Sequence, residues 1–598
     1  MKLYKSYIYA ALGAVLMSTA SCNDFLDRNR YPLDTQTDNP EYWTSKENLE
    51  AQVNALYANF TGYGNTTSWV NNFYYRSLSD DQCGRMQSGS GIVFAEWDYQ
   101  YAPEANSVWD ATYTVLRKCN YIINNANVAN VIENNDFIAK ARLIRAQQNW
   151  ELVRALGDVP LVTEVLDPSS PELYGERTNR NVVMDFVLED LNFAVENIVA
   201  KSDKLEMSKD LANAMKSEIC LFEAAYAKYH QGDETRARKY YDEVIKACNE
   251  VMNSYSLCND YRSLYNSVFT ADAALGLVSL QDNPEVIFMK GYKVGSLCHS
   301  MCKYLSSNTP IAGMTKDAFD AYLFKDGKPR ALTSEDTSDA PEVVTNENGD
   351  AIGLDISKAL ATRDGRLAQT IDSRLAFGAN VTFARETNGV KYSDNLSSNT
   401  GYTICKYVNP NIPYANTATD NTNYTCAPLY WLANIYLDYA EARAEIGALT
   451  DADLNNTINK LYERAGLPSQ TVASLSNMND PANNMNVSSL LWEIRRCRRC
   501  ELMFDQYHRY WDLIRWHCLD LLDTTNYPNI ACGANVSTAT TDQLAGVYTT
   551  DGYINAAKNS AATSVRTFTE REYLQPLGTT IIKLYADKGL ELPQNPGW

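Results

Sequence analysis

Apolar side chains recur at helical spacing through most of the first 255 residues. The runs are clear from Glu47 to Phe60, from about Ser107 onward, and from Val182 to Ala200. Residues three or four positions apart lie on one face of a helix, so this period predicts amphipathic helices that bury one side. Another helical run, KARLIRAQQNWELVRAL, stops at Gly157, and a proline follows shortly after. The N-terminal part is therefore expected to be a stack of helices.

Two pairs of neighbouring helical runs have the character of a repeat. LANAMKSEICLFEAAYAKYHQGD is followed by ETRARKYYDEVIKACNEVM, with small residues at Ala224 and Ala225, a turn at Gly232 and a packing aromatic at Tyr241. YWLANIYLDYAEARAEIG, followed by LNNTINKLYERAGLP, repeats the plan. Stacked pairs of this kind bury a continuous core between them. We predict a mostly α fold on a tetratricopeptide-like helical-hairpin scaffold.

The middle of the chain interrupts the helical pattern. Between residues 256 and 427, short apolar runs such as EVIFMKGY and GYTICKYV alternate with turn-rich stretches such as ENGD and SSNTG. Such alternation predicts small β elements and long loop-rich excursions. We therefore divide one domain, residues 22–598, into N-terminal helices with an aromatic loop (22–255), a loop-rich insertion (256–427) and C-terminal helices (428–598).

The segment from Leu490 to Asp520 combines helical periodicity with arginine. Trp511 and Trp516 lie among six arginines that we call the arginine cluster: Arg495, Arg496, Arg498, Arg499, Arg509 and Arg515. Interleaved aromatics favour burial, and buried guanidinium groups need carboxylate partners. We predict two helices that meet near Gln506 and dock other helices through ion pairs. A solvated basic face is the alternative, whereas the net charge of -20 disfavours nucleic-acid binding.

Aromatic residues are concentrated where a ligand could meet them. The chain has 40 Tyr and 10 Trp against 16 Phe, and Tyr and Trp suit surfaces that are partly wet. A long Gly-, Ser- and Asn-rich segment after Phe60 also carries many aromatics, which favours a binding loop over disorder. Rings that merely pin this loop to the core are the alternative. The candidate ligand-binding residues are Trp69, Tyr74, Trp97, Tyr292 and Tyr304.

The N-terminus has the pattern of an export signal. Lys2 and Lys5 precede an apolar run from Ile8 to Met17, and small residues lead to Cys22. The run is too short to cross a bilayer, which takes about 20 residues. We predict a signal peptide at residues 1–21 and a lipid on Cys22; cleavage after Ala20, leaving a free periplasmic protein, is the alternative. Loss of the two lysines takes the net charge from -20 to about -22.

Motifs for catalysis or cofactors are lacking. No P-loop, dinucleotide fingerprint, H-E-x-x-H or G-x-S-x-G occurs, and only four histidines are present. Cys497 and Cys500 form a single CxxC spacing on a predicted helix, which is not a complete zinc site. The 14 cysteines give no disulfide framework, although Cys248 with Cys258, or Cys298 with Cys302, could pair. We predict a binding protein without cofactor or metal; a secreted glycoside hydrolase and a purely structural scaffold are the alternatives.

Three motifs resemble signatures of the SusD/RagB family of outer-membrane nutrient-binding lipoproteins. The strongest, IRRCRRCELMFDQYHRYWDLIRW, departs from the family at Cys497, where an acid is commoner, and at Gln506, where glycine is. Its matching residues are Glu501, Leu502, Phe504, Arg509, Tyr510, Trp511, Asp512, Leu513, Arg515 and Trp516. The other motifs match at Ala141, Arg145, Ala146, Leu152, Val153, Arg154, Gly157, Asp158, Val159 and Pro160, and at Arg464, Ala465, Gly466, Leu467 and Pro468.

The resemblance carries implications for location, ligand and partner. It implies a protein anchored by lipid in the outer membrane and facing the cell exterior. It also implies that the protein binds an oligosaccharide and delivers it to a SusC-like TonB-dependent transporter. The RagB branch is associated with peptide uptake, so a peptide is the alternative ligand, and nothing in these residues decides between the two.

Overall fold

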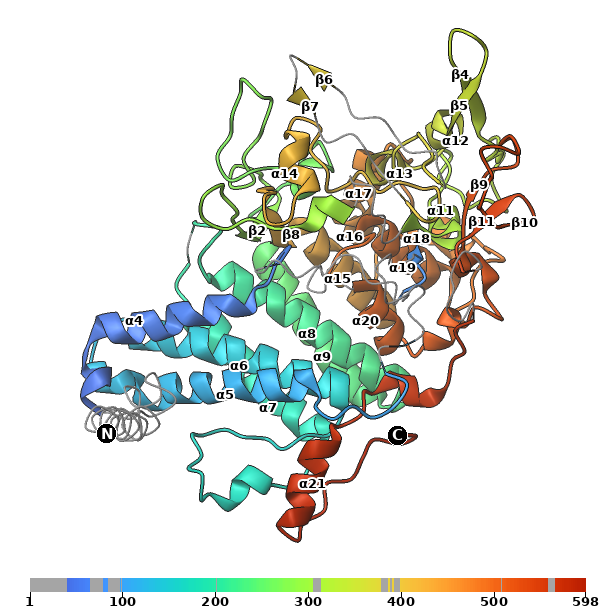
Figure 1. Ribbon diagram of the computed structural model, residues 1–598. Coiled ribbons are helices and arrows are strands. Elements are labelled where there is room, and N and C mark those ends of the chain that lie inside the picture. Colours follow the sequence, from blue (N-terminus) through green and yellow to red (C-terminus); the bar gives the residue numbers. More distant parts are fainter. Residues whose placement is uncertain are drawn as a thin grey trace, which may run out of the picture.

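The computed structural model describes residues 40–64, 79–83, 97, 99–200, 202–304, 313–377, 386–387, 390–391, 398–506, 508–557 and 565–598. Within this part the chain is mostly helical, as predicted (Figure 1). The predicted signal peptide, Cys22, Trp69 and Tyr74 lie outside the described residues. No helix in the described part is both long and apolar enough to cross a membrane.

Consecutive helices form the N-terminal layer. From α5 to α9, each packs against the one before it, and they lie side by side in Figure 1. Among them, α6 is buried along most of its length because helices cover it on several sides. The members of this layer are α4 (Lys46–Ala55), α5 (Ser107–Asn125), α6 (Asn134–Leu156), α7 (Arg180–Asn197), α8 (Lys209–Tyr229) and α9 (Glu234–Val251).

The predicted hairpin of α8 and α9 is confirmed. Gly232 makes the turn with φ of 65°, a left-handed conformation that glycine adopts without strain. The Asp233 side chain then accepts a hydrogen bond of 2.9 Å from the Arg236 N–H and caps α9. At the start of the hairpin, Ser208 caps α8 in the same way. Turn and capping residues that are close in sequence therefore determine how α8 and α9 form a hairpin.

The C-terminal helices pack on the hairpin through α15, which contacts α8, α9 and α19. The predicted partner run of α15, residues 454–468, is not one helix as expected. It breaks at Thr457, where φ is −133° and ψ is −93°, and the Thr457 hydroxyl donates to the Asp453 carbonyl at 2.7 Å. The helices here are α15 (Leu432–Glu445), α16 (Asp451–Asn456), α17 (Ile458–Ala465), α18 (Val472–Ser476), α19 (Ser489–Glu501) and α20 (His508–Arg515).

The middle segment holds small antiparallel strand pairs, as predicted, together with short helices that were not predicted; one pair takes its first strand from the N-terminal part. Its short helices are α10 (Ser263–Asn266), α11 (Lys316–Ala321), α12 (Ser357–Ala361), α13 (Gly365–Thr370) and α14 (Tyr414–Ala418). The two-stranded pairs are β1 (Gln82–Cys83) with β3 (Gly313–Met314), β2 (Val286–Lys290) with β8 (Ala427–Trp431), β4 (Glu342–Thr345) with β5 (Ala351–Asp355), and β6 (Glu386–Thr387) with β7 (Val390–Lys391). Because β8 runs directly into α15, the β2–β8 pair joins the loop-rich part to the helices.

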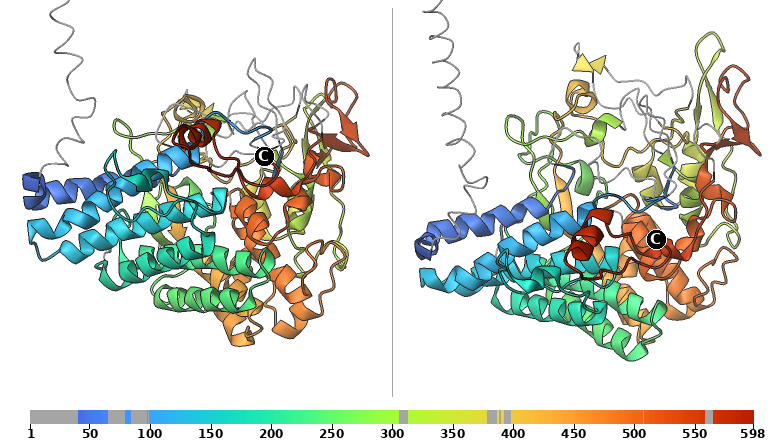
Figure 2. Two further views of the ribbon diagram at one scale, coloured as in Figure 1. Left: turned by 90° about the horizontal axis from the view of Figure 1, so that it is seen from below. Right: turned by 60° about the horizontal axis from the view of Figure 1, so that its bottom comes forward.

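The end of the chain returns to the N-terminal layer. A three-stranded sheet of β9 (Cys532–Asn535), β10 (Thr549–Thr550) and β11 (Tyr553–Asn555) precedes the last helix, α21 (Thr579–Asp587). The Thr579 N–H donates to the Pro103 carbonyl at 2.9 Å, and the Gln575 N–H donates to the Ala155 carbonyl at 2.7 Å. Figure 2 shows α21 lying against the first helices.

Candidate functional site

The arginine cluster lies inside the protein, as predicted, and its charges are paired. Arg495 is 1% exposed and Arg515 is 2% exposed, while Trp516 is buried beside them. The Arg515 guanidinium pairs with Glu441 at 2.5 Å, and the Trp516 indole N–H donates to the same carboxylate at 2.7 Å. The acids that face the cluster come mainly from α15, α20 and segments distant in sequence: Asp80, Asp81, Asp317, Asp438, Glu441, Glu445, Asp480, Glu493 and Asp512.

The turn between α19 and α20 explains one departure from the family signature. Gln506 has φ of 41°, in the left-handed region where glycine is unstrained. Its side-chain amide donates to the carbonyls of Pro428 and Leu429 at 3.3 and 3.1 Å. Glutamine thus accepts backbone strain that glycine would avoid, and gains contacts to β8 in return.

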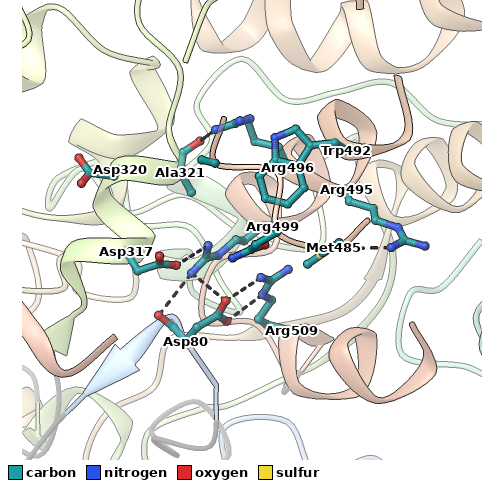
Figure 3. A pocket seen from close by; sticks show the side chains of 12 residues that line it. Asp80, Asp317, Asp320, Ala321, Met485, Trp492, Arg495, Arg496, Arg499 and Arg509 are labelled. Carbon is teal, nitrogen blue, oxygen red and sulfur yellow. Dashed lines mark hydrogen bonds and ion pairs between the residues drawn. The ribbon is translucent and has the colours of Figure 1, made fainter. Parts of the chain in front are cut away.

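The arginine cluster also fixes a short segment that is far away in sequence. Asp80 pairs with Arg509 at 2.6 Å (Figure 3). The neighbouring Asp81 pairs with Arg499 at 2.8 Å. Strand β1 follows these acids and pairs with β3. The segment 79–83 is therefore a buried anchor inside the predicted aromatic loop. Sequence reasoning did not identify it, and the only available signal was two adjacent acids in a Gly- and Ser-rich stretch.

The pKa values of the two anchoring acids are shifted in opposite directions. Burial would raise the pKa of Asp80, but the charges of Arg499 and Arg509 overcome this and hold that pKa well below its usual value. Burial raises the pKa of Asp81 to about 6, against the attraction of Arg499 and with the help of the Asp80 charge. Of the two carboxylates, Asp80 is therefore the one whose ionised form is more strongly stabilised.

The cavity in Figure 3 does not have the dimensions of a ligand site. Its volume is about 90 Å³, and it is lined by Asp80, Asp317, Arg496, Arg499 and Arg509 among others. Sites for small molecules usually span about 300–1,000 Å³. All five of these charged groups already have ion-pair partners. We conclude that this cluster positions helices and the 79–83 segment.

Trp97, one of the predicted ligand-binding residues, is partly buried. Its indole N–H donates to the Thr567 carbonyl at 2.8 Å, and its ring lies 6.5 Å from that of Phe568. Tyr101, four residues on, is 83% exposed. Trp97, Tyr101 and Phe568 therefore lie along two segments, 97–106 and 566–580, that run side by side. Phe568 was not identified from the sequence, because only the fold brings it to Trp97.

The other candidates are placed differently. Tyr292 is 1% exposed, its hydroxyl donates to the Gly64 carbonyl at 2.9 Å, and its ring packs against Tyr63 and His299. Tyr292 lies in the loop after β2, as predicted, but its side chain is buried in this conformation and has no ring face open to a ligand. Tyr304 ends a 3-10 turn that begins at Met301. Trp69 and Tyr74 lie outside the described residues.

Cysteine chemistry gives no site in the described part of the chain. No disulfide joins the described cysteines, so Cys248 is not bonded to Cys258, and Cys298 is not bonded to Cys302. Burial raises the pKa of Cys497 to about 12, which leaves its thiol inert. No group of three or more His, Cys, Asp or Glu side chains that could hold a metal ion occurs among the described residues.

Comparisons with known proteins identify the family. A family model described as the SusD family matches residues 284–598. The chain is similar to a SusD-like protein of Bacteroides ovatus, with 25% identity over 290 residues that cover 44% of this chain and 49% of that protein. It thus spans about half the length of that relative. It is also similar to SusD-like protein P2 of Formosa agariphila, with 26% identity over 69% of this chain and 71% of that protein.

A solved structure supports the fold independently. A SusD-like carbohydrate-binding protein from Bacteroides fragilis superposes with a TM-score of 0.64 and 18% identity, covering 91% of this chain and 99% of that one. The resemblance drawn from the three motifs is therefore confirmed, and it supports the prediction of a non-catalytic binding protein. The matched segment spans more than half of the chain and includes the whole arginine cluster. The protein belongs to the SusD family.

Proposed function

We propose that the protein is a lipid-anchored surface protein that binds a nutrient oligosaccharide and delivers it to a TonB-dependent outer-membrane transporter. The observation that carries this proposal is the match of residues 284–598 to the SusD family. The similar Bacteroides fragilis structure is named as carbohydrate-binding, which supports a glycan as the ligand class. Cys22 would carry the lipid, and the transporter would be a SusC-like protein.

The physical basis is the stacking of sugar rings on aromatic side chains. A sugar ring presents an apolar C–H face that packs on Trp or Tyr, while its hydroxyls bond to polar groups nearby. The exposed Tyr101 and the partly buried Trp97 would offer such faces. Arg566, whose guanidinium lies 5.6 Å from the Trp97 ring centroid, and Arg571 lie on the same pair of segments. Each contact is weak, but several contacts together with tethering at the membrane raise the effective affinity.

Titration calorimetry of the full chain in detergent tests the ligand. The panel would contain laminarihexaose, maltohexaose, xylohexaose, mannohexaose and a set of mixed tripeptides. We expect binding to one hexaose without turnover, and about tenfold weaker binding by Trp97→Ala, since an aromatic contact contributes about 0.5–1.5 kcal/mol. Tyr548→Ala is the control, because Tyr548 is 59% exposed and lies in another part of the fold.

The alternatives would give different results in the same experiment. Binding to the peptides alone would replace the glycan by a peptide ligand of the RagB type. Release of shorter sugars would show a glycoside hydrolase instead. Binding to a hexaose that Trp97→Ala and Tyr548→Ala weaken equally would remove Trp97 from the site.

The anchor is tested separately from the ligand. Cys22→Ser removes the thiol that a lipid would occupy, so the variant should leave the membrane fraction and appear in the soluble fraction. Retention of Cys22→Ser in the membrane fraction would exclude this cysteine as the anchor. Affinity capture of the wild-type chain from detergent-solubilised outer membranes should recover a TonB-dependent transporter, and capture of none would contradict the proposed partner.

A further inference from the structure

A second cavity lies between α5, the segment 160–174 and α21. Its volume is about 340 Å³, within the range of about 300–1,000 Å³ typical of small-molecule sites. Apolar and aromatic side chains form most of its wall, and a few polar groups lie among them. The residues that the argument uses are Trp109, Tyr113, Thr114, Arg117, Glu164 and Glu172.

Three distant parts of the chain hold this cavity in a defined shape. Arg117 on α5 donates to the Leu166 carbonyl at 2.7 Å, which fixes the 160–174 segment against the helix. The Tyr585 hydroxyl donates to the Gly175 carbonyl at 3.0 Å, which fixes α21 against the end of the same segment. Gly578 lets α21 approach closely, since a Cβ there would lie 2.9 Å from the Asn106 backbone nitrogen. These contacts therefore determine the shape of the cavity.

Its wall combines aromatic faces with unused polar groups. The rings of Trp109 and Tyr113 lie side by side with centroids 4.9 Å apart. Within the described part of the chain, the Trp109 indole N–H and the carboxylates of Glu164 and Glu172 have no hydrogen-bond partner. One donor and two acceptors are therefore available to a ligand beside an aromatic surface.

The charges around the cavity discriminate between ligand classes. Glu164 and Glu172 outnumber the Arg117 guanidinium, so the charges around the cavity would repel an anion. A neutral ligand that both donates and accepts hydrogen bonds does not meet this penalty. A sugar ring has these properties, because its hydroxyls act in both ways and its C–H face packs on aromatic rings.

We propose that this cavity is a second carbohydrate-binding site, for one end of a neutral oligosaccharide, separate from the Trp97 surface. The proposal rests on the proposed glycan-binding function. Trp97 bonds to Thr567, whereas Pro103 bonds to Thr579 at the start of α21. The two sites therefore lie toward opposite ends of the same paired segments. Two weak sites on one anchored protein would increase the retention of a long polysaccharide.

Calorimetric titration with the four neutral hexaoses named above tests the second site. Thr114 is exposed on α5 and lines the cavity, so Thr114→Trp should fill the space without disturbing the core. We expect two binding events in the wild-type chain. Trp97→Ala should weaken one of them about tenfold and leave the other unchanged, and Thr114→Trp should remove that other event. The double variant should keep only the weakened event. Circular dichroism and melting temperatures verify that each variant is folded.

A second variant keeps the test independent of the inserted ring. Glu164→Gln with Glu172→Gln alters only exposed side chains and should weaken the event that Trp97→Ala leaves unchanged by about tenfold, the effect of losing charge-assisted hydrogen bonds. The second site is overturned if Trp97→Ala weakens all binding equally, if Thr114→Trp binds like the wild type, or if the double variant keeps an event of wild-type strength. In those cases the glycan-binding function stands. No binding of any hexaose to the wild-type chain would instead overturn both proposals.

Discussion

The buried ion pair between Asp80 and Arg509 gives the sharpest test of how the arginine cluster works. Asp80 is 3% exposed, and its carboxylate accepts from Arg509 at 2.8 and 2.6 Å. Among the described residues, Arg509 pairs with no other acid, whereas Arg499 also has Asp81 and Asp317. Asp80→Asn would therefore leave one guanidinium buried without a counter-charge.

The size of the effect follows from that burial. Breaking a buried pair by removing one partner typically costs about 3–5 kcal/mol, because the remaining charge is uncompensated. A domain has only about 5–15 kcal/mol of stability in total, so the loss would be large. Replacing both partners, in Asp80→Asn with Arg509→Met, removes the charge itself and should restore part of the stability.

Urea denaturation of the full chain, followed by circular dichroism, measures the stability of the wild type, of the two single variants Asp80→Asn and Arg509→Met, and of the double variant. These four proteins form a double-mutant cycle. We expect a coupling free energy of about 2 kcal/mol or more between the two positions. The control is Asp242→Asn, in the exposed i,i+4 pair of Arg238 and Asp242, which should change stability by less than about 0.5 kcal/mol. Additive effects at positions 80 and 509, or a loss as small as that of the control, would refute the reasoning.

Three further predictions concern other parts of the fold. Burial raises the pKa of Glu218 from 4.5 to about 7, so its stabilising contribution is present below pH 4.5 and is lost as the pH rises through about 7. The melting temperature of Glu218→Gln should therefore rise relative to that of the wild type from pH 5 to pH 8, and a constant difference between them would contradict this. Gly578→Ala should increase hydrogen exchange in α21, because its Cβ would meet backbone atoms at 2.9–3.0 Å. The control Gly353→Ala, whose Cβ would have no atom within 4 Å, should leave this exchange unchanged, and equal exchange in both variants would exclude the clash. Lys406 is fully buried and pairs with Asp505 at 2.9 Å, so Lys406→Met should lower the free energy of unfolding in urea by about 3–5 kcal/mol. Adding Asp505→Asn should restore part of this stability, and no recovery would contradict the importance of the pair.

Local patterns in the sequence determined the helices and which of their faces are buried. The turn at Gly232 and the interior position of Trp516 follow from spacing and residue type, and both agree with the structure. The reason is that helical periodicity and capping depend on residues within one or two turns. The three motifs likewise sufficed to recognise the family.

The tertiary structure alone decided which distant residues meet. Asp80 and Arg509 are 429 positions apart, and no local pattern relates them. Tyr292 is an aromatic near a turn, yet it is buried because the Gly64 carbonyl and the ring of Tyr63 come to it from another segment. The cavity beside Trp109 exists only because α21 returns to α5. A sequence reports whether a side chain prefers burial, but the partner that buries it is chosen by the packing of the whole chain.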